Sequence, residues 1–270
     1  MFDLHAHGPD TWVGQGPRYP WGGLYGGQIV AQALRAASFS VDIDDERAFS
    51  PHSIRAYFIR RGDHTEPVRY EVDRIRNGRS FVTRRVVARQ AIGAILNAEC
   101  SFQKPEQSTP LQTLSMPNVP GPDGIDNTSF SPRFDRRTIP ASEVQGRPRD
   151  GAGRVTAWIR ATDVFTDDDD GPSLHQCWLT YVSDDLPADT VRAAHRAVWR
   201  GDDGVELSGT SLDHTIWFHR PFRSDDWLLH DFSCHHYVGA RGLAVGHVFD
   251  PDGQHVATVA QEVLLREPRT

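Results

Sequence analysis

The sequence predicts an α+β protein built from two tandem repeats, each of which is one helix followed by an antiparallel sheet. Three observations support this prediction. A helical apolar stripe precedes four strand-like runs in the first half, the same order of elements returns in the second half, and a Pro-rich segment separates the two. The 270 residues are 38% hydrophobic and 24% charged, which is typical of a globular protein with one large or two small domains.

The first repeat begins with a helix over residues 26–37, where small and branched apolar side chains recur at spacings of three and four. Strand-like runs follow at residues 53–60, 68–76, 80–90 and 94–103. Asn77-Gly78 lies between the second and third runs and is the strongest short hairpin signal, while residues 91–93 give a weaker turn. This half therefore predicts a helix followed by an antiparallel meander.

The second repeat has the same order of elements. Pro172 and Ser173 open a helix whose apolar residues recur at spacings of three and four up to Tyr181. Strand-like runs follow at residues 215–220, 227–235, 239–249 and 255–266, with a turn at residues 250–253. A long antiparallel sheet wrapped on a central helix is the hotdog fold, so two copies predict a double hotdog with one continuous sheet. The alternative is an α+β protein without internal symmetry.

The segment between the repeats has a different composition. Residues 104–150 contain eight of the eighteen prolines and show no sustained period, which excludes a long helix or a central strand. We therefore expect an N-terminal hotdog repeat over residues 1–104, a Pro-rich connector over residues 105–150 and a C-terminal hotdog repeat over residues 151–270.

Charge and cysteine content restrict the function and the compartment. A formal net charge of −7 argues against a nucleic-acid partner, which would favour a basic excess. No stretch approaches the roughly 20 apolar residues of a membrane span, and no signal peptide is visible at the N-terminus. Three widely spaced cysteines make a disulfide framework improbable, so we expect a cytoplasmic protein.

Several blocks resemble the type II acyl-CoA thioesterases and occur in that family's order in both halves. They are GGQIVAQA at residues 26–33, PHSIRAYFIRRGD at 51–63, RIRNGRSF at 74–81, LDHTIWFHRPF at 212–222, DWLL at 226–229, GARG at 239–242 and VAQE at 259–262. The resemblance implies a double-hotdog hydrolase that cleaves the thioester of acyl-CoA to a fatty acid and free CoA. It also implies no cofactor and no metal, and we expect a homo-oligomer, either a dimer or a tetramer.

The resemblance also implies the catalytic residues. The family's Asp follows a Ser after the second helix, its Ser or Thr lies two positions before an Asp-His pair, and its Gln precedes a Glu in the last strand. These positions correspond to Asp184, Ser211 and Gln261. A second carboxyl, Asp185, follows Asp184, and a second hydroxyl, Thr210, precedes Ser211. Asp185 is therefore an alternative to Asp184, and Thr210 is an alternative to Ser211.

Read on their own, the three residues give weaker signals. Asp184 lies near the C-terminal end of its helix, where the macrodipole disfavours a carboxylate and would raise its proton affinity. Ser211 and Gln261 can each donate and accept, so they can orient a water. Taken singly, the three positions are also consistent with a solvated helix end, a turn hydroxyl and an exposed strand residue.

Other interpretations remain open. Residues 22–27 either leave free amides for an oxyanion at the first helix or only allow close packing. Arginines that could offset CoA phosphates are Arg60, Arg61, Arg84, Arg85 and Arg89. No histidine or cysteine spacing matches a zinc site. An enoyl-CoA hydratase or dehydratase and a non-catalytic acyl-CoA-binding module are the competing functions.

Overall fold

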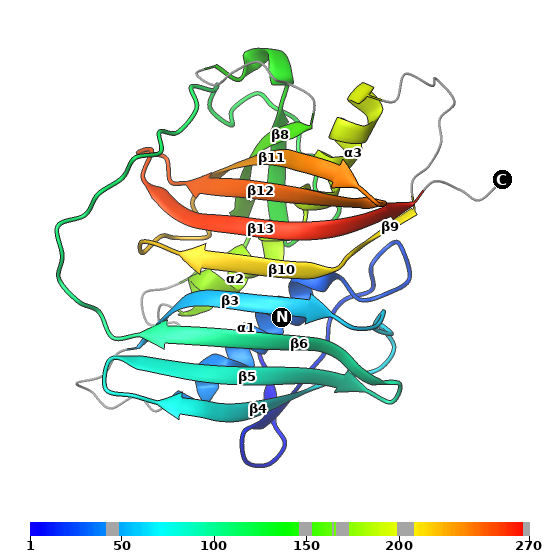
Figure 1. The fold of residues 1–270 in the computed structure, drawn as a ribbon, viewed down its shortest axis with the longest axis vertical. Helices are drawn as coiled ribbons and strands as arrows, with labels where there is room; N and C mark the ends of the chain where they lie inside the picture. The colour runs from blue at the N-terminus through cyan, green and yellow to red at the C-terminus, as the bar shows by residue number, and fades with distance from the viewer. Residues whose placement is uncertain (42–48, 146–152, 164, 166–172, 199–207, 267–270) are drawn as a thin grey trace. The chain divides into compact units, whose positions relative to one another are not determined.

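The computed structural model describes residues 1–41, 49–145, 153–163, 165, 173–198 and 208–266 (Figure 1). The chain forms two compact units. Unit 1 comprises Met1–Pro110, Asp168–Tyr181 and Asp213–Phe218, and unit 2 comprises Leu111–Asp167, Val182–Leu212 and His219–Thr270. None of the described helices is long and apolar enough to cross a bilayer.

Unit 1 is an antiparallel sheet wrapped on helix α1 (Gly26–Phe39), which lies behind the strands in Figure 1. Its strands are β1 (His5–Ala6), β2 (Thr11–Gly14), β3 (Ser50–Phe58), β4 (Val68–Asn77), β5 (Phe81–Gln90), β6 (Gly93–Gln103) and β10 (Asp213–Phe218). Their order across the sheet is β1-β2-β4-β5-β6-β3-β10. The helix and the four strands predicted for the first half are confirmed as α1 and β3 to β6, while β1 and β2 lie upstream of the predicted elements.

Helix α1 is buried on all sides rather than along one stripe. The predicted apolar stripe is buried, and so are Gln28 and Gln32. Buried amides need hydrogen-bond partners. The Tyr19 hydroxyl donates to Gln28 Oε1 at 2.8 Å, and the Tyr70 hydroxyl donates to Gln32 Oε1 at 2.7 Å. These bonds fix the rotation of α1 about its axis.

Within unit 1, the start of α1 closely approaches α2 (Ser173–Ser183) at Gly27. A Cβ atom at this position would lie 2.2 Å from the backbone oxygen of Tyr181 and 2.7 Å from the ring of Tyr25. Only glycine fits so close an approach. The glycine at position 27 therefore allows α1 to pack closely, which is one of the two interpretations of residues 22–27. The element it packs against is helix α2, not the sheet.

Unit 2 is a second antiparallel sheet with a helix on its inner face. Its strands are β7 (Phe134–Ile139), β8 (Arg154–Ala161), β11 (Leu228–Val238), β12 (Arg241–Phe249), β13 (His255–Arg266) and the short β9 (Ser208–Ser211). Their order is β13-β12-β11-β8-β7, and β9 pairs with β13. Helix α3 (Leu186–Val198) packs on β8, β11, β12 and β13. Two units of this kind confirm the predicted double-hotdog fold class.

The elements of the second half are confirmed in part. Helix α2 and strands β10 to β13 follow the predicted runs, whereas α3, β7, β8 and β9 lie outside them. α3 has an amphipathic pattern with few large apolar residues. Its inner face packs on the sheet where Val191 lies over Gly242, so closely that a Cβ atom added at Gly242 would be 2.2 Å from the Val191 side chain. The helical period of α3 is strong, but polar and charged residues outweigh its few large apolar ones, and this helix is missing from the elements predicted from the sequence.

The predicted turns are present. Gly78 follows β4, and its backbone N–H donates to the backbone oxygen of Phe81 at 2.9 Å. Gly93 and Gly253 have φ angles of 107° and 81°, a region that favours glycine. In the β12–β13 turn the carboxylate of Asp250 accepts the backbone N–H of residue 254 at 2.8 Å.

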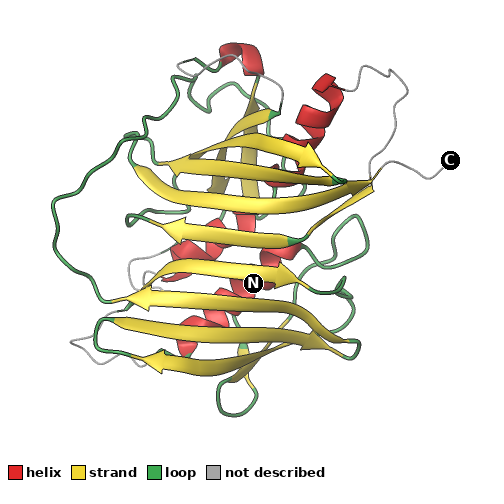
Figure 2. Ribbon diagram, in the orientation of Figure 1, coloured by secondary structure: helices red, strands yellow, loops and turns green. Residues whose placement is uncertain are grey.

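The Pro-rich stretch covers the outer face of unit 2 and contributes its edge strand, β7. We call the segment from Leu111 to Ile125 the strap; loops are green in Figure 2. Buried Ile139, Trp158, Leu229 and Phe249 form a cluster with Leu114, Met116, Val119, Ile125, Val144 and Trp227 packed against it. The indole of Trp158 donates to the backbone oxygen of Pro120 at 2.8 Å. The limits 1–104, 105–150 and 151–270 for the repeats and the connector stay a prediction.

Candidate active site

Asp184 lies in the two-residue link between α2 and α3 and is buried. It follows the C-terminal end of a helix, as the sequence predicts, but the N-terminal end of α3 begins two residues later. A helix C-terminus disfavours a carboxylate and a helix N-terminus favours it, so the two helix ends oppose one another here. The macrodipole of one helix therefore does not by itself raise the proton affinity of Asp184.

Ser211 and Gln261 are positioned by the pairing of β9 with β13. Ser211 is the last residue of β9 and pairs with Val263. The backbone N–H of the next residue, Leu212, donates to the backbone oxygen of Glu262 at 2.9 Å. Because side chains alternate along a strand, the buried Gln261 points to the inner face while Glu262 points outward.

The three predicted residues meet in unit 2. Gln261 Nε2 donates to Asp184 Oδ1 at 2.8 Å and to Ser211 Oγ at 2.7 Å. The Ser211 hydroxyl donates to the same Asp184 Oδ1 at 3.1 Å. One carboxylate oxygen thus accepts from both neighbours, an arrangement that favours the ionised carboxylate. These residues are 27 to 77 positions apart in sequence, so only the fold brings them together.

Asp185, the alternative to Asp184, has a different partner. Its Oδ2 accepts from Arg136 Nη1 of β7 at 2.7 Å, and its side chain is 5% exposed. Burial raises the pKa of Asp185 to about 6, and the charge of Arg136 opposes this rise. The adjacent carboxyls of Asp184 and Asp185 therefore have distinct surroundings.

The raised pKa predicts a pH-dependent stability. The folded protein holds the Asp185 proton more tightly than the unfolded chain, whose Asp pKa is about 3.9. This contribution is fully present below about pH 4 and is lost as the pH rises through about 6, at a cost on the order of 2–3 kcal/mol. Thermal unfolding from pH 4 to 8 should show wild type losing stability relative to Asp185→Asn up to about pH 6 and running parallel above it. A difference independent of pH would contradict this prediction.

The five arginines considered for CoA phosphates all have partners within unit 1. Arg85 pairs with Asp73 at 2.6 Å and Arg89 pairs with Glu71 at 2.7 Å. Arg60 donates to the backbone oxygen of residue 94, and Arg61 donates to that of residue 21. Arg84 is buried and donates to the hydroxyl and backbone oxygen of Ser40 at the end of α1. Arg84 therefore stabilises a helix C-terminus and is not placed to meet a phosphate in solvent.

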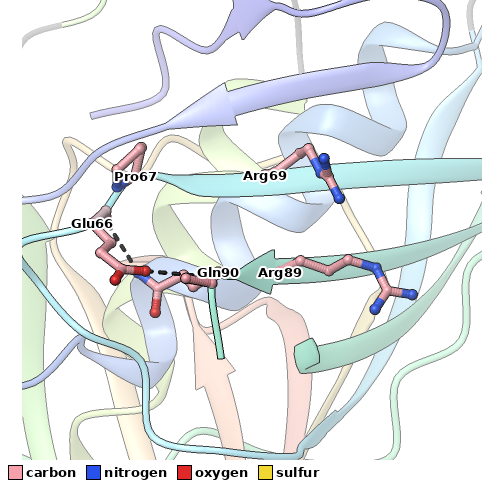
Figure 3. Close-up of a pocket in the computed structure, with 6 residues that line it drawn as sticks. Glu66, Pro67, Arg69, Arg89 and Gln90 are labelled. Atoms are coloured by element: carbon pink, nitrogen blue, oxygen red, sulfur yellow. Dashed lines mark hydrogen bonds between the residues drawn. The ribbon is translucent and has the colours of Figure 1, made fainter. Parts of the chain in front are cut away.

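A surface depression with a volume of about 380 Å³ lies elsewhere in unit 1 (Figure 3). It is lined by Glu66, Pro67, Arg69, Arg89, Gln90 and Ala91. Arg69 and Arg89 share Glu71, at 2.8 and 2.7 Å, so their charges are already offset. The depression contains none of the three predicted catalytic residues.

Cysteine chemistry has little support in the described structure. Cys100 and Cys177 are buried free thiols, and Cys234 is a half-buried one. Burial raises the pKa of all three, that of Cys177 to about 12, so the reactive thiolate is disfavoured. Among the described residues, no group of three His, Cys, Asp or Glu side chains is placed to hold a metal ion.

Sequence reasoning did not identify Arg136, and the signal for it is weak. Arg136 lies 49 residues before Asp185, in the Pro-rich stretch. An Arg-Arg pair flanked by prolines predicts neither a strand nor a contact with the helix link.

Known proteins resemble this chain over nearly its whole length. The family profile of the acyl-CoA thioesterase N-terminal domain matches residues 16–103, and that of the acyl-CoA thioesterase C-terminal domain matches residues 105–265. The chain belongs to the type II acyl-CoA thioesterases. Its activity is that of an acyl-CoA thioester hydrolase.

Individual relatives agree with this assignment. The acyl-coenzyme A thioesterase 8 of Mus musculus is 34% identical over 90% of this chain and 80% of its own length. The acyl-CoA thioesterase 2 of Haemophilus influenzae is 32% identical over 90% of this chain and 87% of its own length. The crystal structure of an acyl-CoA thioesterase II from Mycobacterium marinum superposes with a TM-score of 0.84 at 34% identity, covering 99% and 96% of the two chains.

Proposed function

We propose that Asp184 is the general base of thioester hydrolysis and that Ser211 and Gln261 hold the water it activates. The observation that supports this proposal is the convergence of both polar side chains on Asp184 Oδ1, at 3.1 and 2.8 Å. A hydroxyl and an amide can each donate and accept, so they can orient a water without being ionised. The buried amide of Gln261 and the buried carboxylate keep this arrangement out of bulk solvent.

In this scheme a water bound beside Asp184 attacks the thioester carbonyl carbon while Asp184 takes its proton. The tetrahedral intermediate collapses as the carbon–sulfur bond breaks, and the proton held by Asp184 passes to the CoA sulfur. Acyl-CoA and water give the fatty acid and free CoA, and Asp184 returns to its ionised form. No covalent acyl-enzyme is required.

The direct test is release of CoA thiol, followed with Ellman's reagent on acyl-CoA substrates of increasing chain length. We expect turnover on at least one length. Loss of enoyl-CoA absorbance without thiol would instead indicate a hydratase, and tight binding by calorimetry without turnover would indicate a binding module. Hotdog hydratases pair an Asp with a nearby His, and residues 183–187 contain no histidine.

Ser211→Ala and Gln261→Ala should each lower kcat by about 10–10²-fold, because each loosens the water and leaves the base in place. Their losses should not add, since all three side chains act on one water. A double variant of either with Asp184→Asn should be little worse than Asp184→Asn alone. Steady-state kinetics on one acyl-CoA measures this, and fully multiplicative losses would show that the residues act independently.

The compartment and the assembly are part of the same proposal. Three free cysteines support a reducing compartment, and we propose the cytoplasm. We also propose a homo-oligomer, either a dimer or a tetramer. Light scattering coupled to gel filtration measures the assembly, and a monomer at micromolar concentration would reject it.

A further inference from the structure

Asp184 and Asp185 make up the whole link between α2 and α3. The backbone N–H of Asp185 donates to the oxygen of Val182 at 3.2 Å, which turns the chain tightly at this point. Anything that holds the side chain of Asp185 therefore also restrains the backbone of Asp184, one peptide away.

The side chain of Asp185 is held by Arg136, and Arg136 is itself fixed. Its Nη2 donates to the backbone oxygen of Thr128 at 2.6 Å and its Nε to the Thr128 hydroxyl at 3.2 Å. Its backbone N–H donates to Asn127 Oδ1 at 3.0 Å. Arg136 thus makes one ion pair with the link at Asp185, a longer one with Asp189 of α3 at 3.8 Å, and three hydrogen bonds to the loop before β7, with its side chain only 16% exposed.

Arg136 also offsets negative charge, because several carboxyls lie close together around the link. Asp184, Asp185 and Asp189 bring three carboxyls to the link and the first turn of α3. Asp189 is half exposed and pairs with Arg192 of α3 at 3.1 Å, and it lies 3.8 Å from Arg136 Nη1. From β9 and β13 the groups that face Asp184 are the uncharged Ser211 and Gln261. Arg136 is thus the cation of β7 that offsets the second carboxyl beside Asp184.

We propose that the Arg136–Asp185 ion pair is a positioning element of the active site, which fixes the link that holds Asp184 and cancels the charge of the neighbouring carboxyl. This inference rests on the proposed role of Asp184 as base. It assigns to Asp185 a function separate from that of Asp184: Asp185 acts through the backbone and through charge and does not touch the water.

The test is the acid limb of the pH profile of kcat/KM. In Arg136→Gln a positive charge is lost near Asp184, so ionisation of the base becomes harder and the limb should move up by about 0.5–1 pH unit. Because burial raises the pKa of Asp185 to about 6, its carboxyl is already protonated at the pH where Asp184, held ionised by two donors, gains its proton. Asp185→Asn therefore removes no charge there, and its limb should stay close to that of wild type. The double variant should show the upward shift of Arg136→Gln alone. On the acid side of the limb, a shift of this size changes kcat/KM about 3–10-fold.

A matched control lies on the same strands. Asp135, next to Arg136 on β7, pairs with Arg160 of β8 at 3.0 Å, and it faces the other side of the sheet because side chains alternate. Asp135→Asn and Arg160→Gln remove the same charges and should leave the limb unchanged. Arg136→Lys, which keeps the cation, should restore most of the wild-type profile.

The outcomes are separable. A limb in Asp185→Asn that moves as far as that of Arg136→Gln, or equal shifts in the control pair, overturn the positioning role while the proposed function stands. An absence of any shift in Arg136→Gln does the same. Full turnover by Asp184→Asn overturns both the proposed function and the inference that depends on it. Thermal unfolding of each variant confirms that the profiles are those of folded protein.

Discussion

Asp184→Asn is expected to lower kcat by about 10²–10⁴-fold, the usual contribution of a positioned general base. The amide keeps the shape of the side chain but cannot accept a proton from water. Its two donors, Ser211 and Gln261, remain within 3.1 Å of the same position, so the loss should fall on kcat rather than on KM. Initial rates of CoA release at saturating acyl-CoA measure the effect.

The neighbouring acid provides the comparison. Asp185→Asn should keep turnover within about tenfold of wild type at alkaline pH, where the base is ionised in both proteins. If Asp185→Asn abolishes turnover while Asp184→Asn does not, the base is Asp185. If neither substitution matters, water activation by this link is wrong.

Gly27→Ala is expected to destabilise the protein by about 3 kcal/mol, at the upper end of what overpacking usually costs. The added Cβ would lie 2.2 Å from the backbone oxygen of Tyr181, and α1 cannot move away without disturbing the buried hydrogen bonds of Gln28 and Gln32. For a chain of this size that corresponds to a fall in Tm of roughly 5–6 °C. Differential scanning fluorimetry measures it.

Gly121→Ala is the matched control. No heavy atom lies within 4 Å of a Cβ at this position, so the same methyl group is added in open space. Its Tm should stay within about 1–2 °C of wild type, as for most surface substitutions. An equal fall in both variants would mean that the effect comes from backbone flexibility rather than from the contact between α1 and α2.

The strands predicted from the sequence are those whose local signals are complete. The first half of β4 and most of β5 and β6 alternate buried and more exposed side chains, and the strands are joined by turns at Gly78 and Gly93, so period and turn chemistry agree there. β7 and β8 are harder to predict: β7 follows a run of prolines and pairs on one side only, and β8 is nearly continuously buried and shows little alternation. An edge strand beside prolines has no local pattern strong enough to reveal it.

The three site residues came from resemblance to a family, since none has a local pattern of its own. Asp184 follows a helix, Ser211 ends a four-residue strand, and Gln261 is one of twelve residues in β13. Their contact depends on the register of β9 on β13 and on where α2 ends. The bond between Arg136 and Asp185 spans 49 residues and depends on the same tertiary arrangement. Single-sequence reasoning has no access to contacts of that kind.

The strap covers an apolar part of the outer face of unit 2 that would otherwise favour association with other chains. Without the strap, Trp158, Leu229 and Phe249 would form an exposed apolar surface of the kind through which partly folded chains aggregate. A covering segment made of regular strand would add a new open edge in its place. Pro117, Pro120 and Pro122 lack the N–H groups that such an edge would offer, so the strap shields the sheet without becoming a template for another chain.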